Sequence, residues 1–385
     1  MPDALATPEV LQWARGTAHL TVDEVARRMN LSPDTVRAWE EGSAVPTYAQ
    51  LERLAYEVYR RPLPVFYFPE PPIERLARHQ FRTLPETEFM TLPPKAIYII
   101  RKATTMQMYA RLFSEGSNPP GEAFISELVS LRGSTMEEAA ARVRNLLGVS
   151  LDTQVRWRNT NTALREWRKA MERKGICVFR EPLETDEISG FCLFDSQFPV
   201  IYLNSSMPKS RQIFTIFHEL AHIMWETSGV DKIDDSYIRR LERSERRIEI
   251  FCNYLAGRVL VPDRDFDARS SGQEISDLLI QDLARTYSVS REVILRKLLE
   301  RRLVTREEYE QKAEIWTEEA RVAGRSREGG PNFYRIRISY LGDRYLSLAF
   351  GAYYAQRIDS VGLARSLGVK VSQLGRLEAE WRGAR

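Results

Sequence analysis

The sequence predicts a mainly α-helical protein with a small β-sheet near its middle. Two observations support this fold class. Apolar residues recur at helical spacing, behind serine and threonine caps, over most of the 385 residues. Residues 176–204, by contrast, hold three short runs of β-branched and aromatic residues separated by turn residues, which is the pattern of strands.

The composition is that of an ordinary globular chain, with 43% hydrophobic and 28% charged residues. A net charge of +3 excludes a binder of polyanions over the whole surface. Three cysteines are too few for a disulfide framework. No apolar run approaches the ~18 residues of a membrane span, and the N-terminus lacks the features of a signal peptide. We therefore expect a cytoplasmic protein with no membrane partner.

The first 70 residues predict a bundle of short helices. Thr21 is placed to cap one helix, in which Val25 lies on the apolar face. Ser32 followed by Pro33 is the start signal of the next. Residues 62–72 are rich in proline and predict an extended linker.

Further helices and three strands follow along the chain. Helices are expected at 48–58, 94–147 with a break at 116–121, 162–174, 211–226, 237–261 and 275–303. The strands are expected at 176–179, 188–194 and 198–203. Residues 324–330 predict a hinge before a basic helical tail. These patterns predict four parts, at residues 1–70, 71–160, 161–303 and 304–385.

Two of the four histidines fall in one apolar helix, as His218-Glu-Leu-Ala-His222. The i, i+4 spacing puts both imidazoles on one face, where they can converge on one ion. Glu219 lies beside such an ion, where its carboxylate can take a proton from a zinc-bound water. Two ordinary core histidines are the alternative. Burial of the pair beside an unpaired glutamate is, however, costly without a cation.

A third metal ligand is expected from a later helix. The candidate carboxylates are Asp231, Asp234, Asp235, Glu242, Glu245 and Glu249. Glu249 lies deepest in the apolar part of its helix, whereas the arginines around Glu245 indicate a surface ion pair. We therefore predict Glu249 as the third ligand. Cys252 on the same helix is expected to be a small buried residue.

Three motifs in this order carry a family resemblance. Residues 215–222, residues 249–256 and Leu260-Val-Pro262 together resemble the ImmA/IrrE family of bacterial zinc metallopeptidases. In that family an HExxH helix precedes a Glu-x-x-Ala/Cys-Asn-x-Phe/Leu-Ala helix that ends in Leu-Met-Pro or similar. The match covers about residues 165–300, with Ala221 where glycine is usual.

The resemblance implies a zincin-like α+β metallopeptidase domain. It implies Zn²⁺ held by His218, His222 and Glu249, with Glu219 as the general base. Weaker candidates for supporting the ligands or facing the substrate are Asn204, Asn253 and Tyr254, and helix packing is the alternative for the last two.

The strands at Ile188–Asn204, which end in Ile201-Tyr-Leu-Asn204, also resemble the edge strand of that family. The backbone of the Val200–Asn204 strand is therefore expected to align an extended peptide by strand addition.

Residues 21–54 resemble the xenobiotic-response-element, or Cro/repressor-like, helix-turn-helix family. The matching positions are Val25, Ala26, Leu31, Val36, Trp39, Glu40, Gly42, Pro46 and Leu51. The resemblance makes Arg15, Arg37 and Arg53 candidate phosphate contacts. Val22 and Pro33 stand where the family often has glutamine, so DNA binding and protein docking both remain open.

Charge is distributed unevenly between the two ends of the chain. Residues 1–70 carry seven arginines, no lysine and ten acids, a formal charge of −3 that opposes binding to a polyanion. Residues 331–385 carry nine basic and four acidic residues, a formal charge of +5. The tail is therefore the better electrostatic candidate for contact with nucleic acid.

Two functions from different classes follow from the resemblances. The first is a regulatory zinc endopeptidase that hydrolyses a peptide bond in a repressor- or antitoxin-like partner. The second is a non-proteolytic DNA-binding regulator, or an antitoxin that partners a toxin nuclease, with a structural or vestigial zinc site.

Overall fold

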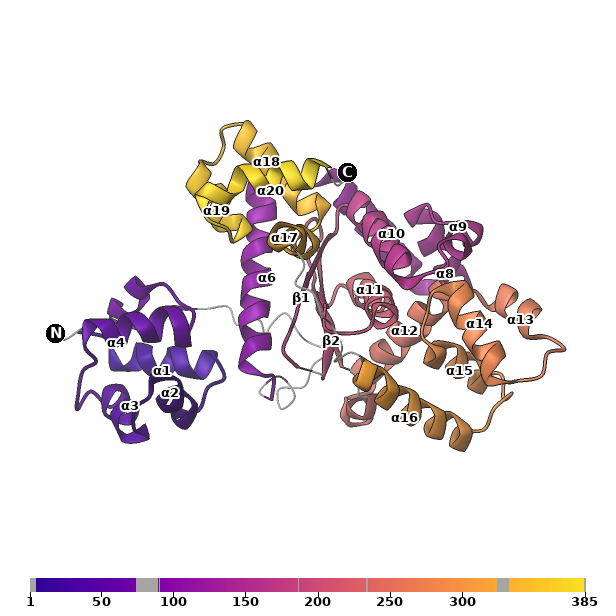
Figure 1. Ribbon diagram of the computed structural model, residues 1–385, viewed down its shortest axis with the longest axis horizontal. Helices are drawn as coiled ribbons and strands as arrows, with labels where there is room; N and C mark the ends of the chain where they lie inside the picture. Colours follow the sequence, from indigo (N-terminus) through magenta and orange to yellow (C-terminus); the bar gives the residue numbers. More distant parts are fainter. Residues whose placement is uncertain are drawn as a thin grey trace. The chain divides into compact units, whose positions relative to one another are not determined.

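The computed structural model describes residues 5–73, 89, 91–185, 187–232, 235–323 and 332–383. The chain divides into two compact units, one of Met1–His79 with Pro85–Lys102 and one of Gln80–Leu84 with Ala103–Arg385. Most described residues are helical, and the strands form one small mixed sheet, which confirms the predicted fold class (Figure 1). The predicted hinge at 324–330 lies outside the described ranges, and the four-part division stays a prediction.

The first unit is a bundle of short helices. Its elements are α1 (Pro8–Thr17), α2 (Val22–Met29), α3 (Pro33–Glu40), α4 (Tyr48–Arg53), the π-helical turn η1 (Leu54–Val58) and the 3-10 turn η2 (Leu63–Tyr67). The Thr21 hydroxyl accepts from the backbone N–H of Glu24, whose carboxylate accepts from the Thr21 N–H. The Ser32 hydroxyl accepts from the backbone N–H of Thr35 at the start of α3, so both predicted helix starts are confirmed.

The proline-rich stretch 62–72 was wrongly predicted as an extended linker. Residues Leu63–Tyr67 form a 3-10 turn, and Phe66 is fully buried in the core of the first unit. The backbone N–H of Thr7 donates to the carbonyl of Phe66 at 3.0 Å. Proline fixes the backbone angle of its own residue, but it leaves a neighbouring aromatic side chain free to pack.

The second unit carries the sheet. Helix α6 (Pro94–Phe113) continues into it from the first unit. Before the sheet come α7 (Pro119–Ser130), η4 (Leu131–Gly133), α8 (Met136–Leu147), α9 (Leu151–Arg156) and α10 (Thr160–Arg173). The strands and the helix between them are β1 (Cys177–Glu181), β2 (Ile188–Leu193), β3 (Val200–Asn204), α11 (Lys209–Met224) and β4 (Val230–Lys232).

The rest of the unit is helical. It consists of η5 (Asp235–Arg240), α12 (Arg243–Leu260), α13 (Asp263–Ser270), α14 (Asp277–Tyr287), α15 (Arg291–Glu300), α16 (Arg306–Ala323), α17 (Phe333–Leu341), α18 (Asp343–Tyr354), α19 (Ser360–Leu367), η6 (Val371–Gln373) and α20 (Leu374–Gly383). None of the helices in the described ranges combines the length and apolar character that a membrane-spanning segment needs.

Side chains alternate between the two faces of the sheet, as the two-residue period of a strand requires. One face contributes Val178, Cys192, Ile201 and Leu203 to the core that contains α11. On the other face the rings of Phe191 and Tyr202 stack at 5.0 Å, and Phe179 meets Tyr345 of α18 at 5.2 Å. Helix α11 is therefore enclosed, and every residue from Gln212 to Met224 is buried.

The prediction that Val200–Asn204 is an edge strand was wrong. The strand order is β1-β3-β2-β4, and β3 pairs with β1 in parallel and with β2 antiparallel. Its backbone groups are therefore used on both sides and cannot receive a peptide by strand addition. Strand β4, which the sequence analysis missed, lies at one end of this order and pairs with β2.

Two long predicted helices are each broken in the structure. The helix expected at 237–261 is η5 followed by α12. The helix expected at 275–303 is α14 followed by α15, because Ser288 adopts a left-handed conformation with φ of 57°. Ser290 then caps α15 through the N–H of Val293. Serine side chains bond to nearby backbone groups and so favour helix ends, and Ser288 and Ser290 could have indicated this break in the sequence.

A cluster of charges ties three helices together around Asp263 at the start of α13. Its carboxylate accepts from Lys297 Nζ at 2.5 Å and from Arg301 Nη2 at 2.8 Å, and it lies 3.0 Å from Arg258 Nε. Burial acts to raise the pKa of Asp263, but the cations outweigh it and lower that pKa to about 2. The carboxylate therefore favours the folded state while it is charged.

We predict that Asp263→Asn lowers the free energy of unfolding at pH 6 by about 1 kcal/mol after allowance for solvent screening. Because the folded pKa lies below the unfolded value of about 3.9, the difference from wild type should shrink as pH falls from 4 towards 2. Denaturant titrations at stepped pH measure it, with the exposed Asp282→Asn as the control. A gap that stays constant down to pH 2.5 would contradict the prediction.

Candidate metal centre

Three of the predicted ligands meet between α11 and α12. The Nε2 atoms of His218 and His222 lie 3.2 Å apart. Glu249 comes from α12, and its two carboxylate oxygens lie 3.4 Å from the Nε2 atoms of His218 and His222, respectively. All three side chains are almost fully buried.

The three side chains form a triangle in which a different Glu249 oxygen faces each imidazole, and these separations are close to those between neighbouring ligands of a tetrahedral ion. Bonds of about 2.0–2.1 Å, as in zinc sites, separate neighbouring ligand atoms by about 3.3–3.4 Å. Within the described part of the chain, Glu249 Oε2 has no hydrogen-bond partner, which is unfavourable for a buried carboxylate. Two imidazoles and one carboxylate also leave a fourth position open. The residues therefore fit a tetrahedral divalent cation.

Each imidazole is oriented by a polar neighbour. The Nδ1–H of His218 donates to Asn253 Oδ1 at 3.1 Å, which turns Nε2 towards the triangle. Nδ1 of His222 lies 3.5 Å from the hydroxyl of Thr227, a longer contact of the same kind. Asn253, a weak candidate from the sequence, thus contacts a predicted ligand directly.

Glu219 lies next to the triangle and makes no ion pair with it. Its side chain is fully buried, and the thiol of Cys192, a weak donor, contacts its carboxylate. Burial raises the pKa of Glu219, and the nearby His222 and His218 only partly oppose this. A carboxyl group held by so weak a donor is available to an external proton donor.

The negative charge around the triangle is concentrated on Asp231 as well as Glu249. Burial acts to lower the pKa of His218, but Asp231 and the two glutamates outweigh it and raise that pKa to about 9. Asp231 was a candidate ligand, but its oxygens accept from Arg211 Nη2 and the Thr215 hydroxyl, each at 2.7 Å. Asp234, another candidate, lies outside the described residues.

Cys252 is a second potential third ligand. Its thiol lies within 4.8 Å of the ligand atoms of both histidines. Burial raises its pKa well above the ordinary value, which favours the neutral thiol. The carboxylate of Glu249 is closer to both imidazoles, at 3.4 Å. We therefore regard Glu249 as the stronger candidate.

The turn that follows α11 presses against His222, and the sequence analysis missed it. A Cβ atom added at Gly229 would lie 2.6 Å from Cγ and 2.7 Å from Nε2 of the His222 ring. Only a residue without a side chain fits there. A glycine directly before a short β-branched run, at Gly229, was the one sequence feature that could have predicted this close approach to His222.

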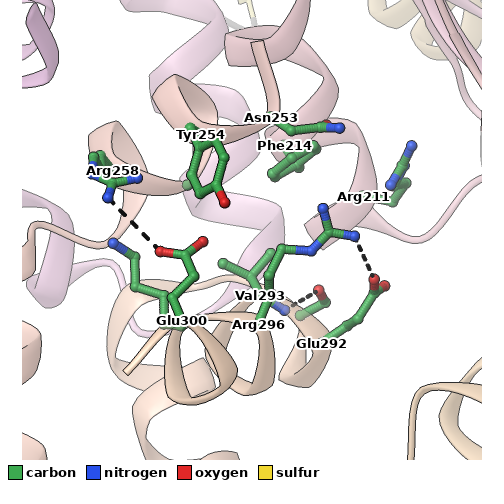
Figure 2. Close-up of a pocket in the computed structure, with 12 residues that line it drawn as sticks. Arg211, Phe214, Asn253, Tyr254, Arg258, Glu292, Val293, Arg296 and Glu300 are labelled. Atoms are coloured by element: carbon green, nitrogen blue, oxygen red, sulfur yellow. Dashed lines mark hydrogen bonds and ion pairs between the residues drawn. The ribbon is translucent and has the colours of Figure 1, made fainter. Parts of the chain in front are cut away.

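A small pocket of about 50 Å³ lies beside the centre, between α11, α12 and α15 (Figure 2). Asn253 and Phe214 line it, and the Phe214 ring lies 6.2 Å from that of His218. Tyr254 also lines the pocket, is 39% exposed and has Arg258 over its ring at 5.1 Å. The candidate Tyr254 is thus placed to contact a ligand there.

Asn204 is used by the protein itself. Its amide nitrogen donates to the carbonyls of Thr185 and Ile188, at 3.0 and 2.8 Å. Its oxygen accepts from the backbone N–H groups of Leu183 and Ser206. These bonds hold the segment that joins β1 to β2, so the structure does not support the expected substrate contact.

The three candidate phosphate-binding arginines of the first unit all have internal partners. Arg15 forms a two-bond pair with Glu40, at 2.7 and 2.8 Å. Arg53 donates to the carbonyls of Met29 and Arg28. Arg37 pairs with Asp34 at 2.6 Å but is half exposed, so it is the most accessible of the three.

Comparison with known families agrees with this geometry. Residues 171–299 match the family model of the IrrE N-terminal-like domain, a peptidase family, and residues 9–62 match that of a helix-turn-helix domain. The second unit contains an IrrE-like domain. Both resemblances drawn from the sequence are thereby confirmed, and the protein joins a metallopeptidase-family domain to a helix-turn-helix domain.

A characterised relative is the radiation response metalloprotease IrrE of Deinococcus radiodurans, with 36% identity over 72 residues. The matched stretch covers 18% of this chain and 21% of that protein. The chain thus spans about a fifth of the length of the curated relative.

We predict that Glu249→Gln lowers the zinc content of the IrrE-like domain at least tenfold. The two imidazoles are neutral ligands, and an amide oxygen lacks the negative charge with which the carboxylate offsets the charge of Zn²⁺. Cys252→Ser should keep about one zinc per chain. Metal analysis after dialysis against a weak chelator measures both. Loss of zinc from Cys252→Ser together with full retention by Glu249→Gln would identify Cys252, and not Glu249, as the third ligand.

We also predict that Gly229→Ala weakens zinc binding by about 10- to 100-fold, because the added methyl group displaces the His222 ring. Gly351→Ala, where no atom lies within 4 Å of the added carbon, is the matched control. Competition with a chromogenic chelator gives both affinities. Equal affinities of the two variants would show that the ring tolerates the methyl group.

Proposed function

We propose that the IrrE-like domain is a zinc-dependent endopeptidase that cleaves a partner protein. The observation that carries the proposal is the triangle of His218, His222 and Glu249 beside the buried carboxyl group of Glu219. Two imidazoles, one carboxylate and a separate carboxyl group are the parts that metal-assisted hydrolysis of an amide requires.

Bound zinc would supply a Lewis acid that polarises the scissile carbonyl and lowers the pKa of water towards about 7. Glu219 accepts the proton of the attacking water and returns it to the leaving amine. Its burial supports this role, because burial raises the pKa of the carboxyl group and so makes its carboxylate a stronger base towards the water proton. Asn253 keeps the Nε2 of His218 directed at the ion.

The natural substrate that we propose is a repressor- or antitoxin-like protein in the cytoplasm. The helix-turn-helix domain in the same chain supports a role in gene regulation, and DNA and protein are both candidate partners of that domain. The pocket lined by Phe214, Asn253 and Tyr254 is the candidate subsite for a substrate side chain.

A second function is favoured by the burial of the site. His222 and Glu219 are fully buried and His218 is 2% exposed, so a peptide reaches them only after the surrounding chain moves. A site that stays closed would serve as a structural zinc site in a non-proteolytic regulator, or in an antitoxin that partners a toxin nuclease.

We predict that Glu219→Gln lowers cleavage of a co-expressed repressor or antitoxin from a neighbouring gene by about 10²- to 10⁴-fold, because the amide cannot accept the proton. Zinc content should stay near that of wild type. Gel analysis of the partner over time measures cleavage, with the exposed Glu187→Gln as the control. Cleavage by Glu219→Gln at the wild-type rate would exclude this mechanism, and an intact partner with zinc-loaded wild type would favour the non-proteolytic function.

A further inference from the structure

A large basic groove lies in the second unit, away from the metal centre. It has a volume of about 1280 Å³ and is lined by residues of α10, α17, α18 and α20, together with Arg180 of β1 and Lys209 of α11. Helices α17, α18 and α20 belong to the yellow C-terminal group in Figure 1, and α10 lies beside them. Nine of the lining residues are lysine or arginine and three are acidic.

One wall of this basic groove carries a row of cations on α10. Arg165, Lys169 and Arg173 are exposed and follow one another at four-residue spacing, so they share one helix face at intervals of about 6 Å. Among the described residues, no carboxylate lies within ion-pair distance of Lys169 or Arg173. Arg165 pairs only with the neighbouring Glu166.

The facing wall adds arginines from the C-terminal helices. Arg376 of α20 is exposed, and its guanidinium lies 4.9 Å from the ring centre of Tyr334. Arg335 of α17 is 77% exposed and makes a long contact of 3.6 Å with Glu380. Arg344 of α18 donates to Asn118, but its buried Nε has no hydrogen-bond partner in the described part of the chain.

The acidic residues of the groove are already engaged. Glu172 is buried, pairs with Arg168 at 3.0 Å and accepts from the N–H of Asp343 at 3.2 Å. Asp343 in turn accepts from the indole N–H of Trp381 at 2.7 Å. These contacts fix the C-terminal helices to α10 and leave the exposed surface of the groove positive.

We infer that the basic groove binds a single-stranded nucleic acid through its phosphodiester backbone. Seven of the nine cations are arginines, whose planar guanidinium groups suit phosphate oxygens. The volume exceeds the roughly 300–1,000 Å³ of most small-molecule sites, which favours an extended ligand. Cations that come from α10 and from the C-terminal helices can contact successive phosphates of one chain, as in grooves that track a single-stranded backbone.

This inference does not depend on proteolysis, because it concerns another face of α10. The opposite side of that helix packs on α11, where the Trp167 ring meets that of Phe217 at 4.8 Å. The groove and the metal centre can therefore be tested separately, by binding and by metal content.

The test measures binding of the full-length chain to a labelled single-stranded DNA of about 16 nucleotides by fluorescence anisotropy, between 50 and 250 mM NaCl. The triple variant Lys169→Glu/Arg173→Glu/Arg376→Glu should bind at least tenfold more weakly at 50 mM NaCl. The slope of log affinity against log salt should fall by about 2, since each lost phosphate contact removes about 0.7.

Two controls separate this site from general charge and from the first unit. The matched variant Arg142→Glu/Arg264→Glu/Arg285→Glu removes three exposed arginines elsewhere in the second unit and should bind as wild type does. Arg37→Glu in the helix-turn-helix domain should also bind normally. If the charge-reversed groove variant fails to fold, Lys169→Gln/Arg173→Gln/Arg376→Gln replaces it, with an expected loss of at least threefold.

Four results would overturn the inference. These are no binding of single-stranded DNA by wild type, an equal loss in the matched control, equal binding of a duplex of the same sequence, and equal binding of polyglutamate with the same charge. The last would show that the groove accepts an acidic peptide as readily as a nucleic acid.

Discussion

The packing of α12 against α11 is the contact on which the second unit depends. It brings the Glu249 carboxylate to two imidazoles inside a core that also holds Glu219 and Asp231, all of them almost fully buried. Such a concentration of charge is unfavourable unless it is paired or bound to a metal. Arg211 and Thr215 satisfy Asp231, whereas Glu249 relies on the two imidazoles and Glu219 on the weakly donating thiol of Cys192. A cation would supply the missing compensation.

The layers around α11 explain how these groups are held. The sheet covers one side of the helix and α12 another, so the imidazoles cannot turn outwards. Gly229 allows the chain to return close to His222, and Asn253 fixes the ring of His218. Helix α10 packs on α11 through Trp167 and lines the basic groove with its exposed residues. One small core thus supports both the buried metal centre and the exposed basic groove.

The sequence was informative where the signal is local. The spacing of His218 and His222, and a glutamate inside an apolar stretch at Glu249, are properties of single helices. Strand order was not predictable in this way, because the parallel pairing of β1 with β3 joins segments on either side of β2. The basic groove was also hidden, since its walls come from α10 and from helices that begin about 160 residues later. The formal charge of +5 on residues 331–385 predicted only that a partner of the tail would be negatively charged.

X-ray absorption at the zinc edge of the zinc-loaded protein would show directly whether His218, His222 and Glu249 hold the ion. We expect one zinc per chain in a shell of nitrogen and oxygen at about 2.0–2.1 Å, with the outer-shell signature of two imidazoles. A sulfur neighbour at about 2.3 Å would instead identify Cys252 as a ligand. That result, or a protein that binds no stoichiometric zinc, would contradict the assignment of Glu249 and the mechanism built on it.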